Sequence, residues 1–244
     1  MAATTKILLV PVATIGCGKT TTAQTLVNVA PHVFGSVAND DMPSGASGRR
    51  RFFRTGLNEL VEHNVVILDK NNHQYRERTM VFDEVAKHRA DFLSDDVRLK
   101  VICLSFVKGS PREPTLWKTT TTRVIERGDN HQSIKANKDG PGVVYRIMGG
   151  FAKRFEPIDK MKKPDNLFDL VIQLEVEGDS SLRNARKILR VLSERFPEVV
   201  SMYPSDEEWK QAFTKALNYT PDHTKLIRKR AGAQTTSRKE NNVS

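Results

Sequence analysis

The sequence predicts an α/β fold in which a parallel β-sheet is covered by helices on both faces. Three observations support this class. Short runs rich in Val, Ile and Leu recur along the chain, stretches with helical spacing of apolar residues separate them, and turns containing Gly, Pro or Asp join the two. Continuous apolar runs are typical of strands that are buried on both faces, as they are in a parallel sheet.

The alternation can be followed from the N-terminus. KILLVPVA (6–13) is expected to be the first strand, and a helix follows because apolar residues then recur at helical spacing: Ala23, Leu26, Val27 and Ala30. Further strands are expected in GSVAN (35–39), VVILD (65–69), KVICLSFV (100–107) and FDLVIQLEV (168–176). Helices are expected over 51–62, 79–92, 111–127 and 182–196, the last ended by Pro197.

Length and composition favour one globular domain. The 244 residues, 38% of them hydrophobic, suffice for a single core, which we place in residues 1–222. No apolar run reaches the roughly 20 residues that a membrane helix needs, and the N-terminus lacks the pattern of a signal peptide. Two cysteines are too few for a disulfide framework. We therefore expect a protein without a membrane partner in a reducing compartment, nuclear or cytoplasmic and not secreted.

The net charge of +10 is unevenly distributed. Residues 223–244 carry six basic residues and one acidic residue in a polar segment, which is typical of a disordered tail or linker. Another basic cluster comprises Arg49, Arg50, Arg51 and Arg54. These arginines are candidates for binding RNA phosphates, and a solvated helix face is the alternative.

The end of the first strand carries the strongest motif. IGCGKTT (15–21) places two glycines, a lysine and a hydroxyl where a strand gives way to a helix. Such a turn directs backbone N–H groups and a helix N-terminus at a phosphate, so it predicts a nucleotide-binding P-loop. We expect Lys19 to neutralise the phosphates and Thr20 to bind Mg²⁺. The residues expected to contact nucleotide are Ile15, Gly16, Cys17, Gly18, Lys19, Thr20 and Thr21, although Ala13 stands where the usual motif has its first glycine.

Carboxylates follow the next two strands. VANDDM ends the second strand, and because neighbouring strand residues point to opposite faces, only one of Asp40 and Asp41 should face the cleft. We favour Asp40 as a general base for phosphoryl transfer. Asp69 ends VVILD, where a ligand of a water on Mg²⁺ would lie. The alternative for each is a carboxylate that caps a turn.

A movable, basic segment is expected in KTTTTRVIERGDNHQS. Arg123 and Arg127 are four residues apart, so a helix projects both from one face, and RGDN then breaks into a loop. Two guanidinium groups on a mobile lid suit a transferring phosphoryl group, which needs positive charge when the site closes. A solvated helix face is the alternative.

Three segments of the sequence resemble a known family. PVATIGCGKTTTAQTLVN, VANDDM and RVIERGDNHQS together resemble the central polynucleotide kinase domain of fungal tRNA ligase, from the first strand to about residue 220. The resemblance implies a P-loop kinase fold with a mobile lid, and a kinase that transfers the γ-phosphate of GTP, with Mg²⁺, to the 5′-OH end of a cleaved tRNA half, the tRNA 3′ half, during splicing. By the same resemblance Lys19 and Thr20 match the phosphate-binding pair, Asp40 the base and Arg127, ahead of Arg123, the essential lid residue. It also implies ligase and cyclic phosphodiesterase domains in the full-length protein, of which we expect this chain to be the middle domain.

Guanine recognition has two candidates. MKKPDNLF contains Lys163, Pro164 and Asp165, a partial match to the N-K-x-D guanine motif of small GTPases, although here it precedes a strand. Asp179, just beyond the last strand, is the rival by position. A surface turn is the alternative for each.

Two other functions compete with the kinase. A nucleotide-hydrolysing switch would need a D-x-x-G element to sense the γ-phosphate, and none directly follows an expected strand. A non-catalytic RNA-binding module would suit the charge, but it gives no reason for GCGKT beside NDD.

Overall fold

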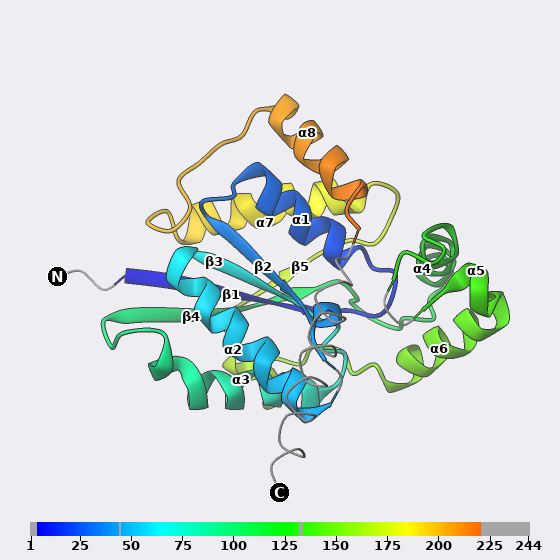
Figure 1. The fold of residues 1–244 in the computed structure, drawn as a ribbon, viewed down its shortest axis with the longest axis horizontal. Coiled ribbons are helices and arrows are strands. Elements are labelled where there is room, and N and C mark those ends of the chain that lie inside the picture. Colours follow the sequence, from blue (N-terminus) through cyan, green and yellow to red (C-terminus); the bar gives the residue numbers. More distant parts are fainter. Residues whose placement is uncertain (1–3, 44, 132–133, 221–244) are drawn as a thin grey trace, which may run out of the picture.

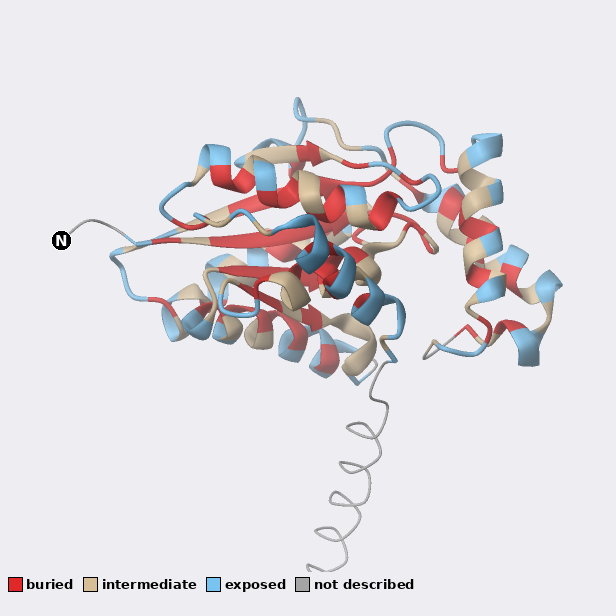
Figure 2. Cartoon of the chain, turned by 90° about the horizontal axis from the view of Figure 1, so that it is seen from above, coloured by how far each residue is buried: buried red, intermediate tan, exposed pale blue. Residues whose placement is uncertain are grey.

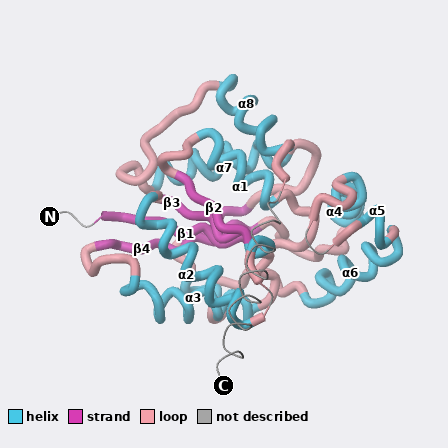
Figure 3. The backbone as a smooth tube through the Cα atoms, viewed as in Figure 1, coloured by secondary structure: helices cyan, strands magenta, loops and turns pink. Residues whose placement is uncertain are grey.

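Five parallel strands form one sheet at the centre of the molecule (Figures 1 and 3). A computed structural model describes residues 4–43, 45–131 and 134–220, so the predicted tail at 223–244 lies outside the described residues. The strands are β1 (Thr4–Val12), β2 (Phe34–Ala38), β3 (Val65–Asp69), β4 (Val97–Ser105) and β5 (Leu170–Gln173), in the spatial order β2-β3-β1-β4-β5. After β1 the chain continues to β2 and β3, which lie on one side of β1 in the sheet. It then crosses to β4 and β5, which lie on the other side of β1. Ligands bind at such a switch point, outside the carboxyl ends of the strands.

Helices cover both faces of the sheet, as the sequence predicts. Figure 1 shows α1 (Lys19–Val29), α7 (Ser180–Arg195) and α8 (Asp206–Leu217) above it, and α2 (Ala46–Glu62) and α3 (Tyr75–His88) below. α1 packs against α7 and α8. The buried residues concentrate in the sheet and on the helix faces turned toward it (Figure 2). All five residues of β3 are buried, which explains its uninterrupted apolar run.

A small helical subdomain lies beside the carboxyl ends of the strands. It comprises α4 (Pro114–Glu126), α5 (Ala136–Asp139) and α6 (Pro141–Arg154), and Figure 1 shows it apart from the two helical layers. Its own apolar cluster contains Ile15, Val124, Ile134, Ala136, Val144 and Met148. Since Ile15 belongs to the turn after β1, this subdomain, the lid, packs directly on that turn.

The fold class is confirmed, and some of the expected elements need correction. The described structure has α5, α6 and α8, which the sequence reading did not include, and three short 3₁₀ helices, η1 (Asn39–Asp41), η2 (Arg89–Asp91) and η3 (Asp165–Leu167). α2 begins five residues before the expected position, at Ala46, while β5 covers only four residues of FDLVIQLEV. Phe168 and Leu174, which flank β5 in that run, are buried although they lie outside the strand. The apolar run therefore predicted a strand that is longer than the observed one.

Candidate active site

The turn between β1 and α1 is shaped by two glycines. Gly16 and Gly18 have φ angles of 83° and 84°, which glycine adopts without strain. A Cβ atom on Gly16 would lie 2.4 Å from the Thr120 carbonyl oxygen of the lid. α1 begins at Lys19 without a side-chain cap, so its first N–H groups are directed at the space in front of the helix. The turn therefore has the geometry of an anion-binding site.

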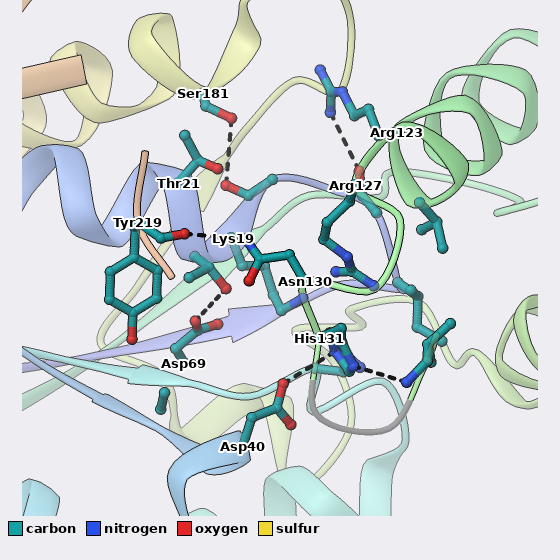
Figure 4. A pocket seen from close by; sticks show the side chains of 18 of the residues that line it. Lys19, Thr21, Asp40, Asp69, Arg123, Arg127, Asn130, His131, Ser181 and Tyr219 are labelled. Atoms are coloured by element: carbon teal, nitrogen blue, oxygen red, sulfur yellow. Dashed lines mark hydrogen bonds and ion pairs between the residues drawn. The ribbon is translucent and has the colours of Figure 1, made fainter. Parts of the chain in front are cut away.

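The hydroxyl that follows Lys19 is tied to the neighbouring strand. Thr20 donates a hydrogen bond of 2.6 Å from Oγ1 to Oδ2 of Asp69, at the end of β3 (Figure 4). Burial raises the pKa of Asp69, and Lys19 and the bond from Thr20 oppose the rise. Paired oxygen ligands of this kind fit Mg²⁺ held together with phosphate oxygens. Among the described residues no cluster of three or more His, Cys, Asp or Glu forms a separate metal site.

Asp40 lies in η1 at the end of β2, beside the lid. Its Oδ2 is 3.1 Å from Nε2 of His131, a lid residue for which the sequence alone predicts no role. Burial opposes ionisation of Asp40, but His131, Lys19 and Arg127 together lower its pKa below the ordinary value. Asp40 is therefore an ionised carboxylate at neutral pH, as a general base must be. Asp41 also lines the cavity.

The two lid arginines differ in their surroundings. Arg123 donates from Nη2 to the carbonyl oxygen of Gly178 at 2.7 Å and to the Ser180 hydroxyl at 3.2 Å, so it links α4 to the start of α7. Arg127, at the end of α4, has Nε and Nη2 buried without a hydrogen-bond partner among the described residues. Burial lowers the pKa of Arg127, and Asp40 opposes this. Arg127 thus lines the cavity with two donors that have no hydrogen-bond partner among the described residues, whereas Arg123 uses its donors within the protein (Figure 4).

One cavity of about 890 Å³ brings most of the expected residues together. Those that line it are Ile15, Gly16, Gly18, Lys19, Thr20, Thr21, Asp40, Asp69, Arg123, Arg127 and Asp179. Cys17 does not line it, because its side chain is buried with Sγ 3.4 Å from Oγ1 of Thr14. Cys17 can therefore contribute only its backbone to a ligand.

Asp165 is a structural residue, so the expectation that it reads guanine is wrong. Its side chain is fully buried and accepts two hydrogen bonds from Arg78, of 2.6 and 3.0 Å, and a third from the Asp159 backbone. Asp165 does not line the cavity. Its carboxylate is saturated inside the protein, and the local sequence pattern carried no information about Arg78, 87 residues away.

The expected RNA-binding arginines lie on α2, outside the main cavity. Arg50, Arg51 and Arg54 line a shallow hollow of about 520 Å³ together with Phe92. Arg54 is fixed there by an ion pair of 2.5 Å with Asp91, and its guanidinium lies over the Phe92 ring. Arg49 is exposed on the same helix. RNA contact by these four residues stays a prediction.

Further cavity residues were not foreseen. Asn130 of the lid donates to the backbone oxygen of Tyr219 at 3.3 Å, which links the lid to the end of α8. Phe213, Ala216 and Leu217 of α8 also line the cavity. The sequence carries two local signals for this helix, the Ser205–Glu208 capping box that starts it and the helical spacing of Trp209, Ala212 and Ala216.

The phosphate-binding turn, the Thr–Asp pair beside it and the switch-point position define a P-loop phosphotransferase of the kinase class. More particularly, the chain belongs to the tRNA ligase kinase domain family, whose sequence model matches residues 8–177. Residues 180–244 match the fungal tRNA ligase phosphodiesterase domain. The resemblance to the kinase domain of fungal tRNA ligase is confirmed.

Individual relatives agree with this family assignment. The chain is 39% identical to the tRNA ligase of Candida albicans over 230 residues, which is 92% of this chain and 27% of that protein. It is 38% identical to tRNA ligase 1 of Schizosaccharomyces pombe over 225 residues, 90% of this chain and 26% of that protein. The chain thus spans about a quarter of these relatives. A crystal structure of a fungal RNA kinase matches it with a TM-score of 0.81 and 38% identity, over 90% of this chain and 100% of that one.

The family boundary does not coincide with a structural one. The phosphodiesterase match begins at residue 180, yet α7 and α8 pack on α1, the helix that starts at the phosphate-binding turn. In the described residues no helix is long and apolar enough to cross a membrane.

Proposed function

We propose that this protein is a GTP-dependent RNA 5′-hydroxyl kinase that acts on the 5′-OH end of cleaved tRNA halves during tRNA splicing. The observation that carries the proposal is a single cavity lined by a phosphate-binding turn, an ionised carboxylate and a lid arginine, two of whose donors have no hydrogen-bond partner among the described residues. The tRNA ligase relatives and the fungal RNA kinase support the RNA substrate.

The residues divide the reaction between them. Asp40 accepts the proton of the RNA 5′-hydroxyl as its oxygen attacks the γ-phosphorus of GTP, and the bond to the β-phosphate oxygen breaks. Lys19 and the N-terminus of α1 hold the β- and γ-phosphates, and Arg127 stabilises the charge on the transferring group. Mg²⁺, held by Thr20 with Asp69 behind it, would neutralise the developing negative charge.

The guanine preference is assigned to the α7 and α8 end of the cavity. Asp179 is exposed, lines the cavity and makes no side-chain cap on α7 although it precedes that helix. A free carboxylate in this position can accept hydrogen bonds from the N1–H and N2 amino groups of guanine. The apolar side chains of Phe213 and Leu217 provide surface for the base.

The test is a transfer assay with Mg²⁺, γ-labelled GTP or ATP and an RNA that carries a 5′-OH. We expect label on the RNA end, more from GTP than from ATP, and none when the RNA already carries a 5′-phosphate. Free phosphate without labelled RNA would instead identify a nucleotide-hydrolysing switch. Retention of RNA without either product would identify a binding module.

A further inference from the structure

The cavity has two ends, separated by the phosphate-binding turn. One end is formed by α7 and α8 on the α1 face of the sheet. The other includes Lys70 and Asn71 after β3, Glu77 of α3, and Ile147 and Phe151 of the lid helix α6. Since α3 covers the opposite face of the sheet from α1 (Figure 1), the two ends lie on different sides of the turn.

The second end adjoins the proposed base. Asp40, the loop after β3 and α6 line the same cavity, and β2 and β3 are neighbours in the sheet. A nucleotide that occupies the α7 and α8 end presents its γ-phosphate toward Asp40, so the attacking group arrives from this second end. If the proposed function holds, that group is the first nucleoside of the RNA.

The apolar surface at this second end of the cavity is held in place by neighbouring side chains. Ile147 and Phe151 are four residues apart on α6 and so project from one face of the helix. The ring of Phe151 stacks on His73 with centroids 4.6 Å apart and an interplanar angle of 28°. His73 is itself held, with Nδ1 2.7 Å from Glu77 Oε2. Both are half-buried or buried, so this aromatic surface exists before any substrate arrives.

Polar groups border this surface on two sides. Lys70 Nζ lies 3.4 Å from Glu77 Oε1, and Oδ1 of Asn71 is buried without a hydrogen-bond partner among the described residues. The exposed guanidinium of Arg154 lies over the Phe151 ring, 5.5 Å from its centroid, so a base that stacks on this ring takes the place of that guanidinium. An aromatic face beside cationic groups and a free acceptor matches a nucleoside followed by a phosphate.

We propose that Ile147 and Phe151 form a subsite for the 5′-terminal nucleoside of the RNA, with its base stacked against Phe151. This inference rests on the proposed function and names the part of the substrate that the lid holds. It also gives α6 a role in substrate binding in addition to covering the site. Because stacking accepts every base, the subsite favours a terminal base without selecting its identity.

The experiment compares two RNAs that differ only in whether the 5′-terminal nucleotide carries its base, with steady-state transfer from GTP as the readout. Stacking on an aromatic side chain contributes about 1–3 kcal/mol per base. The abasic end should therefore raise the RNA KM of the wild type by about 5- to 150-fold. Phe151→Ala should raise the KM of the normal RNA similarly and lose most of its sensitivity to the missing base. The KM for GTP should change little.

Two further variants keep the test decisive. Tyr145→Ala, also on α6 but exposed and outside the cavity, should behave as the wild type with both RNAs. Phe151→Tyr should restore the sensitivity to the base, which separates stacking from damage to the lid. The inference is overturned if the abasic end raises the RNA KM of Phe151→Ala by the same factor as it raises that of the wild type. It is also overturned if Phe151→Tyr fails to restore the sensitivity to the base. If the wild type labels neither RNA, the proposed function itself has failed.

Discussion

The two sides of the cavity are built differently. The sheet side is held by its own hydrogen bonds, as between Thr20 and Asp69. The lid has its own apolar cluster and contributes two residues to the site. Arg127 has two donors without a hydrogen-bond partner among the described residues, and His131 contacts Asp40. The Thr20–Asp69 pair is complete without substrate, whereas Arg127 of the lid presents donors whose partners the substrate can supply. This arrangement suits a kinase that must exclude water only when both substrates are bound.

The largest effect is expected where the sheet side meets the reacting atoms. Lys19→Ala and Asp40→Ala should each reduce transfer by about a hundredfold or more, because each removes a charge or a base that acts in the transition state. Thermal unfolding should show an intact fold, since neither side chain is part of the core. Single-turnover transfer to a 5′-OH RNA measures the loss. Near-normal activity of Asp40→Ala would place the base elsewhere, with Asp41 the first candidate to test.

A large effect on stability, separate from chemistry, is expected at Asp165. Asp165→Ala leaves Arg78 charged and fully buried without its partner, which should lower the free energy of unfolding by about 3–5 kcal/mol. The double variant with Arg78→Leu should recover part of the loss, because no buried charge remains. Chemical denaturation measures both. Normal stability of Asp165→Ala with reduced preference for GTP over ATP would contradict the structural role.

Substitutions of the two lid arginines should have different effects, one on the rate of transfer and the other on stability. Arg127→Ala is expected to lower kcat by about a hundredfold with a smaller change in the KM for GTP, because its free donors act on the transferring group. Arg123→Ala should instead lower the free energy of unfolding by about 1–3 kcal/mol, since its hydrogen bonds are made within the protein. Each variant serves as the control for the other, and the reverse pattern would exchange their roles.

The smallest effect is expected at the contact between the two sides. His131 helps to lower the pKa of Asp40, so His131→Ala should raise that pKa. Because the base must be deprotonated, the acid limb of kcat/KM should move to higher pH, while rates well above that limb change little. His88→Ala, which removes a histidine paired with Asp91 far from the cavity, should leave the profile unchanged. A shift to lower pH in His131→Ala would refute this account of Asp40.

The features that could be predicted from the sequence are those encoded in short contiguous segments. The β1–turn–α1 unit, Asp69 and Asp40 lie in contiguous segments in which strand, turn and helix signals agree, and the structure brings them together. α6 was missed because Gly149 and Gly150 interrupt its pattern, although its apolar face is continuous in space. The misreading of Asp165 and the omission of His131 share a cause: each side chain is defined by a partner far away in sequence, Arg78 and Asp40 respectively.

The position of α8 has a practical consequence for anyone who dissects the longer relatives into modules. Phe213 and Tyr219 form part of the cavity wall, yet they fall within the stretch that sequence profiles allot to the neighbouring phosphodiesterase. A gene fragment cut at residue 178 would remove that wall and the outer cover of α1 with it. We therefore expect a fragment that extends through residue 220 to keep the cavity wall intact.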